Sequence, residues 1–259
     1  MKTTTIQSVS KVTQFKRMVL LAAISLPVIG YSQLQNNGTL YIGNNSTVFL
    51  KTGNYGFGPL GKTKTKRTNS IGRLVLASGT TTSLASDTHN IDGYATFLGS
   101  IPYTLPLGDG ILAPIIVEAA DANGVTAAFY KSTPASITSL GNNVASVSNS
   151  EYWDLQGSNA KITLTWRAAT TANLTTSNYT IVGYNTTTDV WDEIASTYLN
   201  PGTVTPTSGS IESNSEINFS TYRFLTIGSK GEPCAPLVAS NNEMLTWDGL
   251  NWRKDNNDN

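Results

Sequence analysis

The side chains best suited to contacting a ligand are aromatic. Tyr152 and Trp153 are adjacent in the chain, and Trp191 follows 38 residues after Trp153. An exposed indole or phenol ring offers a flat apolar face with a polar edge, which suits it to stack on a sugar ring. We therefore name Tyr152, Trp153 and Trp191 as candidate carbohydrate-binding residues. The alternative is that the two tryptophans belong to the core, because large rings contribute heavily to core burial.

Acidic residues accompany these rings and raise the question of catalysis. The two groups are Asp189, Asp192 and Glu193 beside Trp191, and Glu151 and Asp154 beside Trp153. A glycosidase needs two such acids on either side of the bond that it cleaves. No spacing selects a pair here, because the two acids of a β fold can come from any of its strands. A glycoside hydrolase or lyase is therefore the weakest interpretation, and the sequence assigns no catalytic residue.

One polar segment could hold a calcium ion. It supplies Asp87, Asn90 and Asp92 as candidate oxygen ligands, and Asn90-Ile91-Asp92-Gly93 is similar to the middle of an EF-hand loop. The full EF-hand spacing fails, because its twelfth position, which should be Glu, falls on Gly99. The alternative is a polar turn, in which Asp and Asn side chains satisfy nearby backbone groups. No other cofactor is predicted.

The chain is poor in other catalytic side chains. His89 is its only histidine and Cys234 its only cysteine. A single histidine excludes multi-histidine zinc sites and most Ser-His-Asp arrangements, and a single cysteine excludes an intrachain disulfide. We interpret Cys234 as an incidental thiol in a Pro/Gly-rich linker. No phosphate-binding loop, dinucleotide fingerprint or CxxC motif is present.

The amino terminus has the pattern of an export signal. Lys11, Lys16 and Arg17 precede an apolar run over 18–29, which is too short to span a bilayer comfortably. The small residues of Gly30-Tyr31-Ser32 then form a cleavage site. We predict that residues 1–32 are a signal peptide, that Gln33 is the first mature residue, and that no transmembrane span remains in the mature chain.

Removal of that leader makes the chain acidic. The whole sequence has 17 basic and 17 acidic side chains, and residues 1–32 hold four of the basic ones and no acid. Residues 33–259 therefore carry a net charge of about −4. Nucleic-acid binding usually requires a positively charged surface, so this charge does not favour it. The only basic run is Lys62-Thr63-Lys64-Thr65-Lys66-Arg67. We interpret it as a solvated loop, with a protected edge strand or an acidic-glycan contact as alternatives.

The remaining pattern predicts an all-β fold. Charged residues make up only 13% of the chain, and Thr, Val, Ile and Tyr, which suit a pleated surface, are frequent. Lys161–Arg167 alternates cleanly, so Ile162, Leu164 and Trp166 should face the core. The other strands predicted after residue 100 are 113–119, 125–131, 151–155, 178–184, 190–195, 208–212 and 222–227, with a hairpin between 178–184 and 190–195. Their spacing predicts a β-sandwich over residues 101–229.

Residues 33–100 differ from the sandwich. Their predicted strands are short and weakly spaced, at 39–42, 47–50, 72–76 and 94–98. A repeated apolar-x-apolar unit, as in Leu40/Ile42 and Val48/Leu50, suits a few coils of a β-solenoid, and an irregular sandwich edge is the alternative. Residues 230–259 are predicted to be a linker followed by a tail or the start of a further module.

Several segments resemble the amino-terminal part of large exported proteins that use the type IX secretion route. The segments are 38–44, 86–94, 103–108 with 113–115, and 151–155, together with the export signal ending in Tyr31-Ser32-Gln33. Thr246–Trp252 is similar to the phrase Thr-Trp-Asn-Gly-x-x-Trp that opens the next module in such proteins, with Asp248 in the Asn position. The resemblance implies β-rich modules outside the cytoplasm. The carboxyl-terminal sorting domain of those proteins is not visible in this sequence.

These observations define the functional expectation. The chain is expected to be a non-catalytic, exported β module with a structural, adhesive or interaction role at the cell envelope. Its partner is expected to be a polysaccharide or a surface protein, and the alternative function is a carbohydrate-binding module of a polysaccharide-processing system. The expected location is the cell surface or the extracellular space, or the periplasm if no sorting domain follows.

Overall fold

A computed structural model describes residues 33–174, 178–231, 245–247 and 252–254. The predicted signal peptide at 1–32, Cys234 and most of the predicted linker and tail lie outside the described residues. Apart from α1 (Ala168–Thr171) and the 3-10 turn η1 (Pro201–Thr203), every regular element that the structure describes is a strand, which confirms the all-β prediction. Among the described residues, no helix has the length and apolar character needed to cross a membrane.

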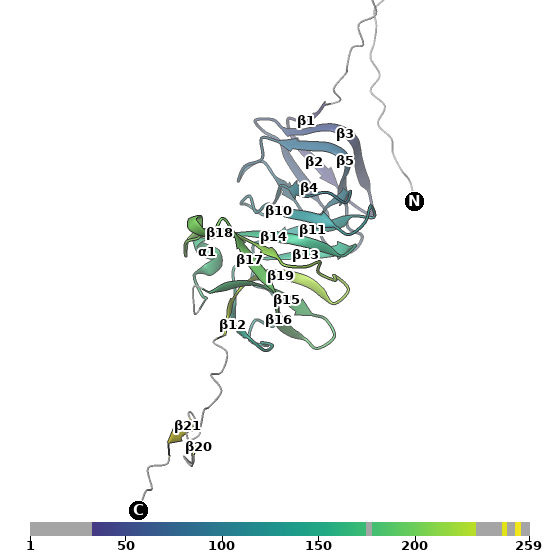
Figure 1. Cartoon of the computed structure of the whole chain (residues 1–259). Helices are drawn as coiled ribbons and strands as arrows, with labels where there is room; N and C mark the ends of the chain where they lie inside the picture. The colour runs from purple at the N-terminus through teal and green to yellow at the C-terminus, as the bar shows by residue number, and fades with distance from the viewer. Residues whose placement is uncertain (1–32, 175–177, 232–244, 248–251, 255–259) are drawn as a thin grey trace, which may run out of the picture.

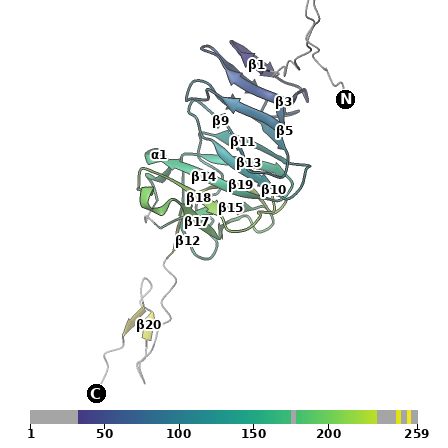
Figure 2. The same cartoon turned by 45° about the horizontal axis from the view of Figure 1, so that its top comes forward.

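The first part of the described chain is a short β-solenoid, whose strands alternate between two parallel sheets (Figures 1 and 2). One set is β1 (Gln33–Asn36), β3 (Thr47–Phe57), β5 (Arg73–Ser83) and β7 (Ala95–Leu98), and the other is β2 (Thr39–Ile42), β4 (Lys62–Thr65), β6 (Ile91–Asp92) and β9 (Leu107–Gly108). Every pairing within each set is parallel. The coil length varies, since Gln33 pairs with Asn54 but Thr47 pairs with Arg73, so the sequence has no regular period.

The first four residues of the basic run, 62–65, form β4, an internal strand of this solenoid. β4 pairs on one side with β2 and on the other with β6. Thr63 and Thr65 are buried, whereas Lys62 and Lys64 are exposed. The side chain of Thr63 bonds to the hydroxyl of Tyr55. The prediction of a solvated loop was therefore wrong. Its threonines can be buried inside the solenoid because other protein groups satisfy their hydroxyls.

The second part is the predicted β-sandwich. The first sheet continues through β11 (Val125–Tyr130), β13 (Tyr152–Gly157), β19 (Tyr222–Lys230), β15 (Tyr179–Asn185) and β16 (Val190–Ile194), with β12 (Val144–Val147) paired to β19. The facing sheet has the order β17 (Ser196–Leu199), β18 (Ser208–Ser213), β14 (Ala160–Arg167), β10 (Ile115–Ala119) and β8 (Tyr103–Leu105). All strand pairs in both sets are antiparallel, and β15 and β16 form the predicted hairpin.

The core lies between these two sheets. Ile162 and Leu164 of β14 are fully buried, and Trp166 is only 2% exposed, as the alternation predicted. Thr163 was expected to face water but is also buried. Its hydroxyl donates a hydrogen bond to Glu212 on the neighbouring strand β18. Since β14 is a central strand, its neighbours cover part of its outer face as well.

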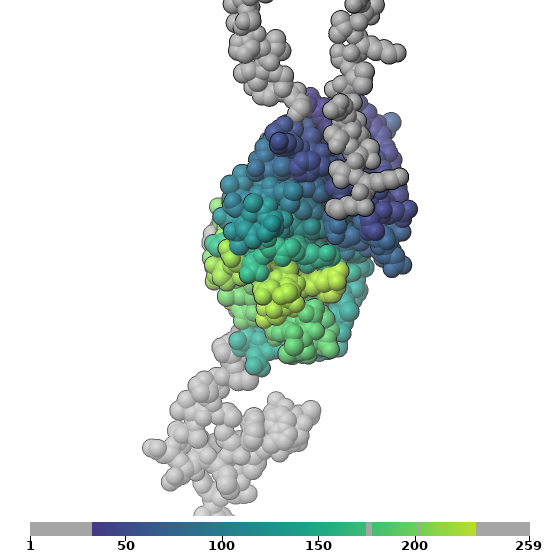
Figure 3. Space-filling view, turned by 90° about the vertical axis from the view of Figure 1, so that its right-hand side faces the viewer, coloured from purple at the N-terminus to yellow at the C-terminus, as the bar shows by residue number. Residues whose placement is uncertain are grey.

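The solenoid and the sandwich share one sheet and one core. β7, the last solenoid strand of the first sheet, pairs antiparallel with β11, so that Ala95 lies opposite Ala127. A single cluster of buried apolar side chains extends from Ile42 to Ile227. In the space-filling view, the surfaces of the solenoid and the sandwich meet without a gap (Figure 3). Beyond this body, β20 (Leu245–Trp247) and β21 (Trp252–Lys254) form an antiparallel hairpin within the segment that resembles the start of a module.

Candidate functional site

We call the ten-stranded sheet that runs from β1 to β16 the main sheet. The two neighbouring aromatic residues of β13 point to opposite faces of this sheet. Trp153 faces the core and is fully buried, with its ring tilted against Phe129 at a centroid distance of 5.2 Å. Its indole Nε1 donates to the carbonyl of Ala113 over 3.4 Å. Trp153 therefore has no free ring face for a ligand, and its candidacy as a binding residue is corrected. Tyr152 lies on the outer face and is half-buried, because successive side chains of a strand alternate.

An aromatic stripe crosses the outer face of the main sheet. We give this name to Tyr130, Tyr152, Phe224, Tyr184 and Trp191, which come from β11, β13, β19, β15 and β16. Successive ring centroids along the stripe lie 4.9, 5.7, 6.3 and 5.4 Å apart. The rings come from five adjacent strands, so strand pairing brings them together although they are distant in the sequence. Four of the five rings are partly exposed.

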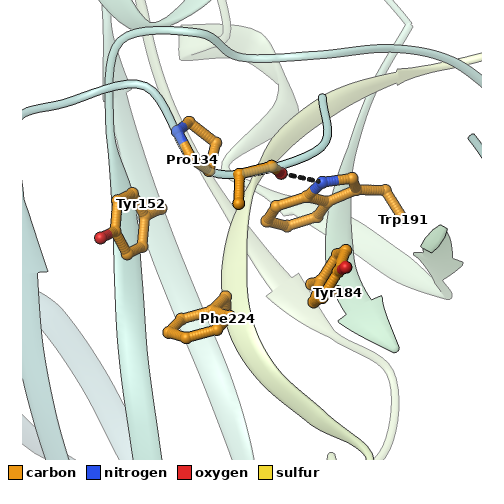
Figure 4. A pocket seen from close by; sticks show the side chains of 6 residues that line it. Pro134, Tyr152, Tyr184, Trp191 and Phe224 are labelled. Carbon is orange, nitrogen blue, oxygen red and sulfur yellow. Dashed lines mark hydrogen bonds between the residues drawn. The ribbon is translucent and has the colours of Figure 1, made fainter. Parts of the chain in front are cut away.

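Trp191 forms the floor of a shallow hollow at one end of the stripe. The indole Nε1 donates to the carbonyl of Ala135 over 3.0 Å (Figure 4). Trp191 is 1% exposed and belongs to a second buried cluster with Val144, Val147 and Val182, so its candidacy as a stacking residue is corrected, as for Trp153. Pro134 and Ala135 form one wall, and the other stripe residues that line the hollow are Tyr152, Tyr184 and Phe224. Its cavity volume is about 60 Å³. That is well below the roughly 300 Å³ of a typical small-molecule pocket, so the hollow suits one protruding group of a larger ligand.

Arg67 lies at the other end of the stripe. Its guanidinium stands over the ring of Tyr130, 4.5 Å from the centroid. The same group donates to the carbonyl of Phe129 over 2.6 Å and forms an ion pair of 2.7 Å with Asp92. These contacts tie the solenoid to the sandwich and fix a cation on one face of the Tyr130 ring. The other face of that ring is covered by Tyr152.

A buried carboxylate supports the centre of the stripe. The side chain of Asp154 is 4% exposed and accepts from Arg223 through Nε at 2.8 Å and Nη2 at 2.9 Å. It also accepts from the hydroxyl of Tyr94 over 2.7 Å. Burial, together with the bonds to Tyr130 and Asp154, raises the pKa of Tyr94 well above its usual range. With three donors in place, Asp154 serves as a structural acceptor.

The other acidic candidates also have protein partners. Glu151 is 5% exposed and accepts from the hydroxyl of Thr170 over 2.6 Å. Burial raises the pKa of Glu151, although the bond from Thr170 and the charge of Arg167 oppose that shift. The three acids near Trp191 have partners on several elements: Asp189 accepts from Tyr184, Asp192 from Asn185 and Tyr222, and Glu193 pairs with Lys230. None of the five acids lines the aromatic hollow.

The calcium candidates are engaged in separate contacts. Asp87 forms an ion pair of 3.0 Å with Arg167, and the hydrogen bonds from Arg167 and Leu112 lower the pKa of Asp87. The amide of Asn90 donates to the backbone carbonyl of Asp87 over 3.0 Å, which closes a polar turn. Asp92 pairs with Arg67. In the part of the chain that the structure describes, no group of three or more His, Cys, Asp or Glu side chains could hold a metal ion.

Sequence reasoning named two members of the stripe as ligand candidates, Tyr152 and Trp191, and missed Tyr130, Phe224 and the wall residue Pro134. Tyr130 and Phe224 lie in segments that were predicted as strands, but their sequence neighbours do not show which strands they pair with. Only the pairing of Tyr130 with Tyr152 and of Phe224 with Tyr184 places them beside the named residues. A hairpin alignment would have found Tyr184 opposite Trp191.

The fold and the site define an all-β protein in which a solenoid and a sandwich share one sheet, with an aromatic stripe on its outer face. A comparison with known families, curated proteins and solved structures finds no match to this chain.

Proposed function

We propose that this chain is a non-catalytic, exported β module that acts in adhesion or interaction at the cell envelope, and that its ligand there is a polysaccharide. Export rests on the leader pattern of residues 1–32 and on the resemblance to proteins of the type IX secretion route. The ligand class rests on one observation, the aromatic stripe with its hollow at Trp191.

The stripe suits an extended chain of sugar rings for physical reasons. Adjacent strands lie roughly 4.8 Å apart, so five strands present rings along about 19 Å of surface. The apolar face of a sugar can lie against such rings, while its hydroxyl groups need hydrogen-bonding partners at the edge. Arg223, whose side chain is 45% exposed, would supply such a group. The small hollow would hold one protruding group of the polysaccharide.

A glycan array tests the proposed ligand. The chain from Gln33 to Asn259 is expected to bind one class of polysaccharide, and Tyr152→Ala and Phe224→Ala are expected to weaken that binding. Tyr41→Ala is the matched control, because Tyr41 is an aromatic residue that is 64% exposed and lies outside the stripe. The polysaccharide proposal would be contradicted if the folded protein bound no glycan on a broad array. Equal losses of glycan binding in all three variants would also contradict it.

A separate experiment tests export. The protein is expected to leave the cytoplasm of a bacterium with a type IX secretion system and to begin at Gln33 when its amino terminus is sequenced. Substitution of Gly30 and Ser32 by bulky residues is expected to block cleavage. Retention of the wild-type chain in the cytoplasm would contradict the proposed export. It would not affect the result of the glycan-binding test.

A further inference from the structure

Charge is divided unevenly between the two parts of the chain. Residues 33–86, which form the larger part of the solenoid, contain six basic side chains and no acidic one. Residues 87–231, which include the sandwich, contain five basic and twelve acidic side chains. The solenoid is therefore positively charged, although the chain after the predicted leader is acidic. Such a separation favours an anionic partner at the solenoid.

Five of the six cations of the solenoid lie on β4, in the turn after it or at the start of β5. We call residues 62–73 the basic corner, and its cations are Lys62, Lys64, Lys66, Arg67 and Arg73. Among the described residues, Asp92 is the one carboxylate that forms ion pairs with the corner, at 3.6 Å from Lys64 and 2.7 Å from Arg67. Asp109 is close enough to act on the charge of Arg67. Five cations against these two carboxylates leave the corner positively charged.

Arg73 carries a positive charge that protein contacts leave uncompensated. Its side chain is partly buried. Within the part of the chain that the structure describes, no acceptor holds the guanidinium by a hydrogen bond or an ion pair, and its Nε is buried without a partner. Buried N–H groups usually bond to protein, to water or to a ligand. The unpaired guanidinium of Arg73 is therefore the group of the corner that is best suited to bind an anion.

Arg73 lies on the same face of the main sheet as the aromatic stripe. Leu74, the next residue of β5, lies opposite Ala95 of β7, and both side chains belong to the core. Arg73 and Tyr94 precede them, so these two residues lie side by side on the outer face, because side chains alternate along a strand. The hydroxyl of Tyr94 lies 3.2 Å from the hydroxyl of Tyr130, the first ring of the stripe. Tyr94 therefore connects the basic corner to the stripe.

The two ends of the stripe differ in charge. At the Tyr130 end, Arg67 stands over the ring, and the rest of the basic corner lies beyond it. At the Trp191 end, the neighbouring charged residues in the sequence are the acids Asp189, Asp192 and Glu193. A negatively charged ligand on the stripe is therefore expected to place its charge at the Tyr130 end.

We propose that the ligand of the stripe is an acidic polysaccharide, whose carboxylate or sulfate groups bind at the basic corner while its sugar rings lie on the stripe. Arg73 is the main contact, because a guanidinium can bind such a group through two parallel hydrogen bonds. Lys64, whose side chain is 51% exposed, adds a second cation. A phospholipid membrane would also attract the corner, but it has no sugar rings for the stripe. This inference rests on the proposed polysaccharide function and adds the charge of the ligand to it.

Pairs of polymers that differ in charge test the inference. The chain from Gln33 to Asn259 is titrated with polygalacturonate and its methyl ester, and with dextran sulfate and dextran. It is expected to bind at least one charged polymer roughly tenfold or more tightly than the neutral member of the pair. Added salt is expected to weaken the binding of the charged polymer, because it screens exposed charges.

Substitutions locate the charge contact. Arg73→Gln is expected to lower the affinity for the charged polymer about tenfold, and Lys64→Gln about threefold. Lys161→Gln is the matched control, because Lys161 is 40% exposed and pairs with Glu212 at 3.7 Å, much as Lys64 pairs with Asp92, but lies on the facing sheet. Thermal denaturation shows whether each variant is folded. Since Lys64 is exposed, its variant tests the corner even if Arg73→Gln does not fold.

Three results would overturn the inference and leave the polysaccharide function intact. The first is equal affinity for the charged and neutral polymers. The second is unchanged binding of the charged polymer by folded Arg73→Gln and Lys64→Gln variants. The third is tighter binding to vesicles of anionic phospholipid than to any of the charged polymers, combined with a positive glycan array. If the chain binds none of the four polymers, the inference is also wrong, and the glycan array shows whether the polysaccharide function fails with it.

Discussion

Tyr130 and Tyr152 lie face to face on adjacent strands of the main sheet, with ring centroids 4.9 Å apart and ring planes 3° apart. Arg67 covers the second face of Tyr130, so that ring is closed on both sides. Tyr152 also makes an edge-to-face contact with Phe224 at a centroid distance of 5.7 Å, and it borders the hollow together with Phe224 and Trp191. Because Tyr152 is partly exposed and borders the hollow, it is the stripe residue that best tests the proposed ligand.

Substitutions at Tyr152 separate ring stacking from hydrogen bonding. Tyr152→Ala removes the ring and is expected to lower the affinity for an oligosaccharide ligand roughly fivefold to tenfold, which corresponds to about 1 kcal/mol. Tyr152→Phe keeps the ring and is expected to retain most of the affinity. Isothermal titration calorimetry with the soluble ligand measures both. Equal losses in the two variants would assign the binding to the hydroxyl instead of the ring.

Trp153→Ala is expected to affect stability strongly, because Trp153 is fully buried against Phe129. Removal of such a ring leaves a cavity and typically costs about 3–5 kcal/mol of unfolding free energy. Urea denaturation measures the change. Tyr41→Ala serves as the exposed control and is expected to change the unfolding free energy by about 0.5 kcal/mol or less. A small effect of Trp153→Ala would contradict its place in the core.

Arg223→Ala is expected to destabilise the fold through Asp154. The variant leaves a buried carboxylate with Tyr94 as its remaining side-chain donor, and we expect a loss of about 2 kcal/mol in unfolding free energy. The double variant Arg223→Ala with Asp154→Asn removes the charge and is expected to recover part of that loss. Chemical denaturation of the two variants measures the difference. If the double variant is less stable than Arg223→Ala, the buried charge is not the cause.

Glu151 is expected to make stability depend on pH. Burial raises the pKa of Glu151 above its ordinary value of 4.5, so the folded state binds this proton more tightly than the unfolded state does. Stability should therefore fall as the pH rises from 4.5 through the folded-state pKa, and then level off. Glu151→Gln, which can still accept the hydrogen bond from Thr170, is expected to raise the unfolding free energy at pH 8 and to remove this dependence.

Thermal denaturation between pH 4 and pH 8 measures the effect of Glu151→Gln, with Glu216→Gln as the control because Glu216 is exposed. The control is expected to follow the wild-type profile. A Glu151→Gln variant with the same pH profile as the wild-type chain would show that Glu151 titrates alike in the folded and unfolded states.

Local pattern was enough to locate many of the strands. The segment 39–42 was predicted with its observed bounds, and 190–195 differs from β16 by one residue. Pattern failed for β4, where alternating Lys and Thr carries little apolar signal although both threonines are buried. The sequence pattern also gave no prediction of β12, a short strand that pairs with β19. Such strands form because a neighbouring strand offers a partner, and one segment of sequence does not reveal that partner.

The strand character of the chain and the inward-facing residues of β14 follow from local sequence, because the alternation of side chains along a strand is a local property. Which ring of β13 reaches the surface depends on the packing of the two sheets, since the second sheet covers Trp153 and leaves Tyr152 outside. The tertiary structure also decides that Tyr130, Tyr152 and Phe224 lie together. That contact depends on the register of three strands from distant parts of the sequence, and register is a property of paired strands.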